Sequence, residues 1–152
     1  YAESRFDASA RSPWGAVGLM QVLPTTARRV GITDPHTPWG SVLAGAKYLR
    51  RLFKFFEEEG VDKRQRVRFA LASYNAGLGH ILDARKLAEA TGRDPNKWFG
   101  HVEEALRLKT DPRYYRHTRH GYARAPETVA YVSRVQSQIV MDRIKPDAPL
   151  PL

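Results

Sequence analysis

One carboxylate near the start of the chain stands among residue types that suit acid catalysis. Glu3 is followed by the apolar residues Phe6, Trp14, Val17, Leu19 and Met20. If such groups shield a carboxyl from water, its pKa rises and it can hold a proton near neutral pH. A protonated carboxyl is what general acid cleavage of a glycosidic bond requires. From residue types alone, an ordinary glutamate at the end of a helix remains the simpler interpretation.

The other carboxylates have plainer explanations. Glu57–Glu59 form a charged run at a predicted helix end, where water solvates them. Asp7 lies four residues after Glu3 and can simply shape the loop there. Glu127 follows Pro126 at a predicted helix start, where the helix dipole alone stabilises an acid. For Glu127, a structural and a functional role are therefore equally open.

The sequence contains no motif for a metal, a nucleotide or an activated serine. His117 and His120 are three residues apart, but they lie in an arginine-rich stretch with no carboxylate close by in the sequence, so surface histidines are favoured over metal ligands. The segment N-A-G-L-G lacks the rest of a phosphate-binding motif, and no G-x-S-x-G elbow is present. We therefore expect no metal and no cofactor.

A basic, aromatic segment, R-Y-Y-R-H-T-R-H-G-Y-A-R, occupies residues 113–124. Such interleaving can bind phosphates and stack bases. It can equally bind a glycan, because tyrosine packs on the apolar face of a sugar and arginine holds carboxylates. A plain surface loop is the third interpretation. No helix-turn-helix or RNA-recognition pattern favours nucleic acid, which we do not expect as a partner.

Composition indicates a globular, cationic protein of one domain. The 152 residues are 42% hydrophobic and 27% charged, which is enough for a core. The net charge of +9 favours polyanions such as nucleic acid, an anionic membrane or an acidic wall polymer. Without cysteines, disulfides are excluded. No apolar run approaches the ~18 residues of a membrane span. Because the chain starts at Tyr1, we expect a domain truncated at its N-terminus.

Apolar periodicity and Gly/Pro punctuation predict a chain made almost wholly of helices. In the helix expected from Trp39 to Glu59, the residues Val42, Ala46, Leu49, Phe53 and Phe56 should share the buried face. Residues 113–125 should be irregular, a short irregular β-hairpin is allowed, and residues 146–152 should form a flexible tail after a domain of residues 1–145. Four other helices are expected at Pro24–Val30, Asp62–Asn75, His80–Thr91 and Pro126–Ile144, and a fifth, capped by Asn96, should carry Trp98, Phe99, Val102 and Leu106. The buried face of the helix Asp62–Asn75 should consist of Val67, Ala70, Leu71 and Tyr74. In the helix Pro126–Ile144, the inward residues should be Val129, Val132, Gln136, Ile139 and Val140.

Four ordered motifs resemble the catalytic domain of soluble lytic transglycosylases, a family related to goose-type lysozyme. The first two are Glu3-Ser4 with S-P-W-G-A at residues 12–16, and G-L-M-Q followed by P-T-T-A at residues 18–27. The third is S-Y-N-A-G at residues 73–77, and the last is E-T at residues 127–128 with Y-V at residues 131–132. The resemblance implies an all-α, lysozyme-like fold with a substrate cleft. It departs from the family at Ala2, where glutamine is usual, and at Ser73, where alanine is usual.

The resemblance also implies the reaction and its residues. The family cleaves the β-1,4 bond between N-acetylmuramic acid and N-acetylglucosamine of peptidoglycan, and a single glutamate, here Glu3, acts as acid and then as base. The product is a 1,6-anhydro sugar. By position, the expected substrate-binding residues are Ser12, Met20, Gln21, Tyr74, Asn75, Glu127 and Tyr131. For Tyr131, core packing is an equally open interpretation.

Softer similarity, in I-T-D, L-D-A-R-K-L-A-E-A-T-G-R-D-P-N-K-W and G-Y-A-R, points to the membrane-bound lytic transglycosylase F branch. That branch implies an upstream solute-binding-like domain, a periplasmic location at the outer membrane of a Gram-negative bacterium, and peptidoglycan glycan strands as partner. Two alternatives stay open: a lysozyme-like hydrolase on the same fold, and a glycan-binding module without catalytic activity.

Overall fold

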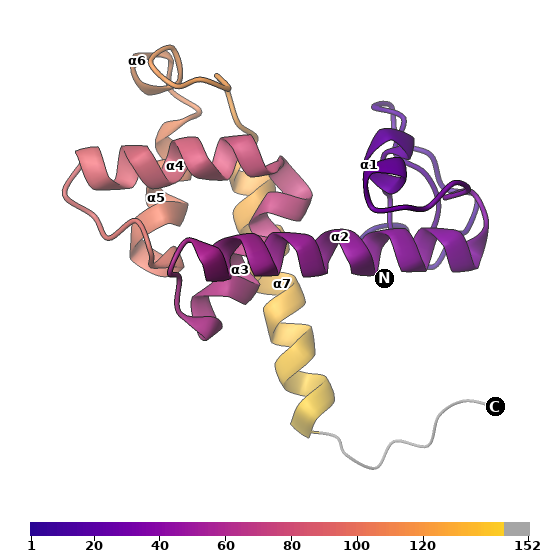
Figure 1. Ribbon diagram of the computed structural model, residues 1–152. Helices are drawn as coiled ribbons and strands as arrows, with labels where there is room; N and C mark the ends of the chain where they lie inside the picture. Colours follow the sequence, from indigo (N-terminus) through magenta and orange to yellow (C-terminus); the bar gives the residue numbers. More distant parts are fainter. Residues whose placement is uncertain (145–152) are drawn as a thin grey trace. The chain divides into compact units, whose positions relative to one another are not determined.

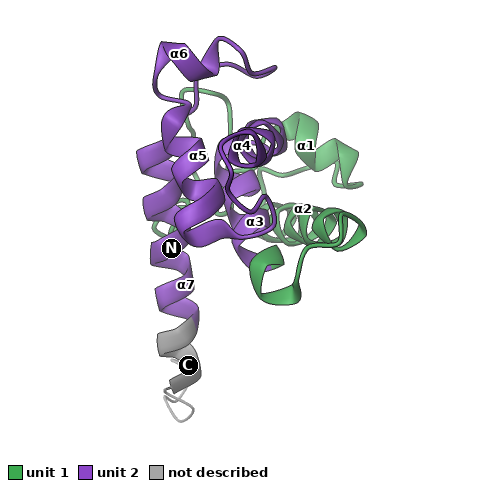
Figure 2. Cartoon of the chain, turned by 90° about the vertical axis from the view of Figure 1, so that its left-hand side faces the viewer, with its two compact units in different colours: residues 1–66 green, residues 67–152 purple. Residues whose placement is uncertain are grey.

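A computed structural model describes the backbone of residues 1–144 and the side chains up to residue 139. The described residues form two compact units, residues 1–66 and 67–144, coloured separately in Figure 2. Helices dominate both units and no strand is assigned in residues 1–144, so the all-α prediction is confirmed (Figure 1). The predicted tail, residues 146–152, lies outside the described residues. No helix in the described part of the chain is both long enough and apolar enough to cross a membrane.

Unit 1 consists of a looped segment and two helices, α1 (Pro24–Arg29) and α2 (Pro38–Glu58), which pack on each other. The hairpin that the sequence allowed is reduced to single bridges, in which Val17 pairs with Arg11 and with Val22. Both helices begin with proline, whose fixed φ suits the first turn. At the start of α2, the Thr37 hydroxyl accepts a hydrogen bond from the backbone N–H of Gly40 at 3.1 Å.

The buried face of α2 differs from the prediction. Phe56 is fully buried, but Val42 and Ala46 are exposed, so their inward placement is wrong. The face is instead made of small residues at its start and larger ones at its end. The buried residues are Gly40, Ser41, Ala44, Gly45, Leu52 and Phe56. Small side chains let the looped segment approach the helix closely, and a pattern of large apolar residues does not detect them.

Unit 2 contains most of α3 (Lys63–Ala76), with α4 (Leu78–Ala90), the π-turn η1 (Trp98–Val102), α5 (Glu103–Leu108), α6 (Pro112–Tyr115) and α7 (Ala125–Ile144). α5 packs on α4, η1 and α7. The rings of Phe69 and Trp98 meet edge to face at 5.8 Å. The core consists of side chains with no exposed surface, among them Phe69, Ile81, Trp98, Val102, Leu106 and Val132.

Three predictions in unit 2 are wrong in detail. Lys97, not Asn96, precedes η1, and the Asn96 amide oxygen accepts a hydrogen bond from Arg85 at 2.7 Å. Non-helical backbone at Phe99 and Gly100 interrupts the predicted helix, which leaves Phe99 44% exposed. Ile139 on α7 is exposed rather than buried. The side chain of Val140, also expected inward, lies outside the described ones.

Candidate active site

The turn that carries Glu3 is hydrogen-bonded to the G-L-M-Q segment of unit 1. Residues 2–6 form turns, with the N–H of Arg5 donating to the carbonyl of Tyr1 at 2.8 Å. The Ser4 hydroxyl, next to Glu3, donates to the carbonyl of Leu19 at 2.9 Å. The Glu3 side chain is half-buried. The catalytic candidate is therefore fixed against the segment that carries the predicted contacts Met20 and Gln21.

Phe6 and Trp14, which the sequence offered as apolar shielding for Glu3, are 75% and 73% exposed. These two side chains are therefore not buried around the carboxylate. Their exposure leaves two large aromatic surfaces on the same looped segment as Glu3. Aromatic rings of this kind suit the apolar faces of sugar rings, since such contacts need a large, rigid, partly exposed surface.

Gln21 stabilises the loop and is restricted by it. Its side-chain N–H₂ donates to the carbonyls of Ala10 and Gly18, at 3.0 and 2.9 Å, and its backbone adopts a left-handed φ of +47°. An amide has two N–H donors and one accepting oxygen. With both donors engaged, the Gln21 side chain can meet a ligand only as an acceptor.

Close approach between the loop and α2 fixes Met20. Its backbone N–H donates to the hydroxyl of Ser41 at 3.0 Å. A Cβ at Gly45 would lie 2.7 Å from the Met20 side chain, and a Cβ at Gly18 would lie 2.7 Å from the Ser41 hydroxyl. The small residues at these positions are what bring loop and helix together.

Ser12 closes a turn with Ala16, within the S-P-W-G-A motif. Its hydroxyl oxygen accepts from the N–H of Ala16 at 3.0 Å, while its own N–H donates to the Ala16 carbonyl at 2.9 Å. Gly15 supplies a positive φ of +82° within this turn. Because the oxygen accepts within the turn, the hydroxyl proton is the part suited to a substrate acceptor.

The remaining candidates lie in unit 2, where the C-terminal turn of α3 meets the first turns of α7. The buried Thr128 hydroxyl donates to the amide oxygen of Asn75 at 2.8 Å. This leaves the N–H₂ of Asn75, which is exposed, as its group suited to a ligand. Tyr74 is half-buried, and Tyr131 is only 6% exposed.

Glu127 lies in the first turn of α7, as the sequence predicts. Its side chain is 64% exposed, and its carboxylate lies 3.9 Å from the guanidinium of Arg124. Such exposed pairs contribute little to stability. The carboxylate is therefore accessible to a ligand, and among the described side chains Arg124 is its one ion-pair partner.

Four of the eight candidates, Glu3, Ser12, Met20 and Gln21, thus share one hydrogen-bonded loop in unit 1. The other four, Tyr74, Asn75, Glu127 and Tyr131, share the junction of α3 and α7 in unit 2. Sequence reasoning assigned no role to Ser4 or Thr128, although both lie in the quoted motifs. It also missed Ser41, because a serine inside a helix gives no signal.

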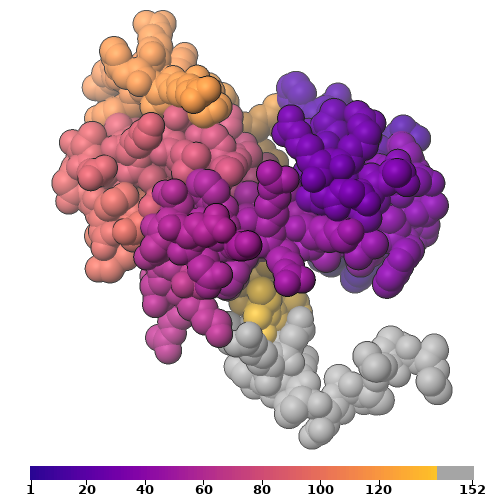
Figure 3. Space-filling model, viewed as in Figure 1, coloured from indigo at the N-terminus to yellow at the C-terminus, as the bar shows by residue number. Residues whose placement is uncertain are grey.

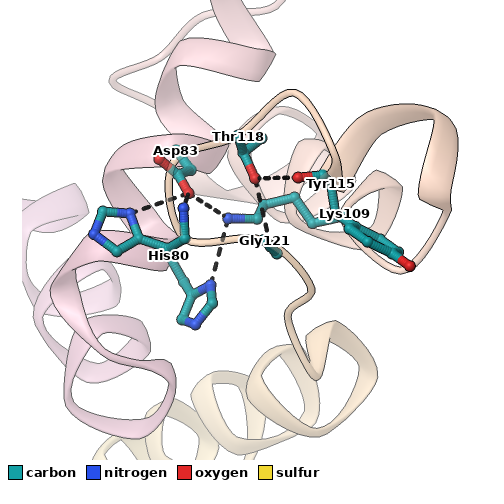
Figure 4. Close-up of polar contacts among 7 residues, drawn as sticks. His80, Asp83, Lys109, Tyr115, Thr118 and Gly121 are labelled. Carbon is teal, nitrogen blue, oxygen red and sulfur yellow. Dashed lines mark hydrogen bonds and ion pairs between the residues drawn. The ribbon is translucent and has the colours of Figure 1, made fainter.

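A buried ion pair in unit 2 also went unpredicted (Figure 4). Lys109 is fully buried, and its ammonium donates to a carboxylate oxygen of Asp83 at 2.7 Å. The same oxygen accepts from the backbone N–H of His120 at 2.8 Å and lies 3.2 Å from its ring nitrogen Nδ1. The carboxylate that lies beside His120 thus comes from a residue 37 positions earlier in the sequence, on α4. Within the described residues, no group of three or more potential ligands could hold a metal ion.

Burial and hydrogen bonding set the charges of this cluster. Burial raises the pKa of Asp83, but hydrogen bonds from Lys109 and His120 outweigh it and lower that pKa to about 2. Burial lowers the pKa of Lys109, and Asp83 opposes that shift. Burial also lowers the pKa of His80, whose ring lies 3.4 Å from the Lys109 ammonium. Asp83 is therefore ionised and largely neutralised at physiological pH.

A family model described as the transglycosylase SLT domain matches residues 1–97. The chain belongs to this family. The matched range includes the six candidates from Glu3 to Asn75, whereas Glu127 and Tyr131 lie beyond it.

Two relatives of the SLT-domain chain carry the name membrane-bound lytic murein transglycosylase F, and a third carries that name followed by the number 2. Identity is 46% over 136 residues for the protein of Shewanella halifaxensis and 43% over 136 residues for that of Vibrio campbellii. A protein named transglycosylase F 2, from Alkalilimnicola ehrlichii, is 43% identical over 137 residues. The matches cover 90% of this chain, which spans 25–30% of the relatives' length. The predicted resemblance to the F branch is confirmed.

Proposed function

We propose that this chain is the catalytic module of a peptidoglycan lytic transglycosylase. One observation carries the proposal: in a chain of the SLT domain family, the Ser4–Leu19 hydrogen bond ties the turn of Glu3 to the G-L-M-Q segment. A solvated helix-end glutamate would not need such a support. Relatives that carry the name lytic murein transglycosylase over 90% of the chain support the same reaction.

In this reaction a single carboxyl serves twice. Glu3, protonated, gives its proton to the oxygen that bridges N-acetylmuramic acid and N-acetylglucosamine, and the bond from the muramic C1 to that oxygen breaks. The acetamido oxygen of the same sugar stabilises the cation at C1. Glu3, now ionised, takes the proton of the C6 hydroxyl, and O6 bonds to C1. Intramolecular attack has a high effective molarity, so neither water nor a second carboxylate is needed.

The other candidates are proposed to hold the sugar. Ser12 donates its hydroxyl proton to the acetamido group, and Gln21 accepts from a sugar hydroxyl with its amide oxygen. Met20 supplies an apolar contact. Asn75 donates its N–H₂ to the glycan. These directions follow from the hydrogen bonds that each side chain already makes within its unit.

Tyr74, Glu127 and Tyr131 are proposed to act on the same substrate. Tyr74 helps to position the sugar, Glu127 contacts sugar or peptide with its exposed carboxylate, and Tyr131 contacts the substrate through its hydroxyl. The first and last of these roles rest on the family resemblance, whereas the exposure of Glu127 supports the second.

For the whole protein, the short share of the relatives' length that this chain spans supports a longer parent. We propose that the parent carries an upstream solute-binding-like domain, and that residues 1–145 of this chain are its catalytic domain. The relatives' names support attachment to a membrane. We propose a periplasmic location at the outer membrane.

Product analysis tests the reaction. The chain is incubated with purified sacculi, and the soluble fragments are analysed by mass spectrometry, where an anhydro end is lighter than a reducing end by one water. We expect anhydro ends from the unmodified chain. We expect Glu3→Gln to lower the rate by about 10²–10⁴, the usual contribution of a general acid–base group. Glu89→Gln, at an exposed glutamate of α4, is the matched control and should leave the rate unchanged.

Each other outcome points to a different function. Reducing ends alone would mean a lysozyme-like hydrolase. Binding to sacculi without any cleavage would mean a glycan-binding module. Equal rates for Glu3→Gln and Glu89→Gln would remove Glu3 from the chemistry.

A further inference from the structure

A pocket of about 500 Å³ lies in unit 2, outside the candidate active site. Its volume falls in the range of small-ligand sites, roughly 300–1,000 Å³. It is formed by α4 and by the segment from α6 to residue 119, the orange part of Figure 3. The side chains that give it its chemistry are Lys86, Leu87, Arg113, Tyr114, His117 and Arg119.

The pocket is electropositive. Lys86 and Arg119 are exposed, and neither forms an ion pair with any residue in the part of the chain that the structure describes. Arg113 is paired with Asp111 at 2.6 Å. Asp83 is the one acidic side chain in the lining, and the buried Lys109 ammonium neutralises it. Two uncompensated cations therefore face the same hollow.

The wall of this pocket is held in place rather than loose. The N–H of His120 donates to Asp83 on α4 at 2.8 Å, which ties the end of the 113–119 segment to that helix. The Thr118 hydroxyl donates to the carbonyl of Tyr115 at 2.9 Å, as Figure 4 shows. The buried ion pair of Asp83 and Lys109 thus supports the pocket wall. Preorganised cations cost less entropy on binding than free ones.

The aromatic residues of the segment do not form a platform for nucleic acid. Tyr115 and Tyr122 pack edge to face on each other at 6.0 Å, so their faces are not arranged for successive bases. Only Tyr114 lines the pocket, beside Leu87 and Ala90. A hollow with one phenol, a short apolar wall and two cations fits a compact ligand with at least two anionic groups.

We propose that this pocket binds an acidic peptide through its carboxylates. Arg119 holds one carboxylate by paired N–H donors, Lys86 attracts a second, and the peptide's aliphatic part packs on Leu87 and Ala90. The proposal goes beyond cleavage of the glycan. It rests on the proposed function only in that the peptide's source would be the wall polymer, whose strands bear peptides.

Fluorescence anisotropy tests the proposal with a dye-labelled peptide of alternating alanine and glutamate that has a free C-terminal carboxylate. The matched ligand is the same peptide with glutamine for glutamate and an amidated end. We expect Lys86→Glu combined with Arg119→Glu to weaken binding of the acidic peptide at least tenfold. The matched control, Lys47→Glu with Arg134→Glu, reverses one exposed lysine and one exposed arginine outside the pocket, and should change Kd less than twofold.

The proposal would be overturned if the unmodified chain showed no preference for the acidic over the amidated peptide, or if the control variant lost binding equally. Two competition results would also overturn it. They are displacement of the labelled peptide by a single-stranded oligonucleotide at a lower concentration than by unlabelled peptide, and displacement by inorganic phosphate at a concentration equal to that of unlabelled peptide. If circular dichroism shows that the double reversal fails to fold, Lys86→Gln with Arg119→Gln replaces it, with an expected loss of at least threefold. Glu3→Gln should bind the peptide unchanged. Failure of glycan cleavage and failure of peptide binding are thus separate results.

Discussion

Replacing Lys109 by methionine tests how strongly the buried ion pair stabilises unit 2. The Lys109 side chain is fully buried, and Asp83, its partner at 2.7 Å, is 6% exposed. Methionine keeps most of the volume and removes the charge, so the main effect is an unpaired carboxylate. Removing one partner of a buried pair typically costs about 3–5 kcal/mol. Because His120 still donates to Asp83, we expect the lower end, about 3 kcal/mol at pH 7.

The pH dependence of this cost has a definite sign. Burial alone would raise the pKa of Asp83, but the hydrogen bonds from Lys109 and His120 lower it from 3.8 to about 2. A carboxyl with a lowered pKa stabilises the fold above pH 3.8, and that contribution is lost as pH falls toward 2. The difference corresponds to about 2 kcal/mol, at ~1.36 kcal/mol per pH unit. Without Lys109 most of this lowering is absent, so the variant loses less on acidification.

Urea unfolding followed by circular dichroism, at pH 7 and at pH 3, measures both quantities. Lys86→Met, at an exposed lysine of the neighbouring α4, is the matched control and should lie within ~0.5 kcal/mol of the unmodified chain. Adding Asp83→Asn to Lys109→Met should recover part of the loss, since the buried charge is then gone. Equal losses for Lys109→Met and Lys86→Met, or a Lys109→Met cost that does not shrink at pH 3, would refute the reasoning.

Two further predictions concern small residues, and both use the same unfolding assay. Ser41 and Ser73 are fully buried helix serines, but the Ser41 hydroxyl accepts from Met20 whereas that of Ser73 has no partner among the described residues. Ser41→Ala should therefore cost about 1–3 kcal/mol and Ser73→Ala nothing, and a reversed order would contradict this. Gly45→Ala should destabilise by about 1–3 kcal/mol, because its Cβ would lie 2.7 Å from Met20. A gain, as at an uncrowded helix glycine, would disprove that contact.

Helix ends could be predicted from the sequence because their causes are local. Gly31, Gly60 and Gly77 all adopt a positive φ at the ends of helices or just beyond them, which glycine does without strain. The irregular segment 113–125 could also be predicted, because it lacks any apolar period. Within it, the structure has only the short helix α6 at the start and the first residue of α7 at the end. These signals act within a few residues, so one sequence is enough to detect them.

What the sequence could not predict depends on partners far along the chain. The buried face of α2 is determined by the contacts of Ser41 and Gly45 with Met20 in the G-L-M-Q segment, and no helical period encodes such contacts. The pairing of Asp83 with Lys109 joins residues 26 positions apart. Buried charges are rare enough that neither residue would be placed inside by composition. For the candidate site, the motifs gave residue identities but not which atoms of each side chain remain for a substrate.

The hydrogen bonds that each candidate side chain makes within its own unit determine which of its atoms remain for a substrate. Gln21 donates both amide N–H groups to the carbonyls of Ala10 and Gly18, and the amide oxygen of Asn75 accepts from the Thr128 hydroxyl. The two amides are thus left with opposite characters, one accepting and one donating, in two different units. A glycan offers both hydroxyl donors and acetamido acceptors, so each amide, taken by itself, has a complementary group in such a ligand. Many of the motif residues therefore stabilise their own unit through hydrogen bonds, and in unit 1 those bonds hold the turn that carries Glu3.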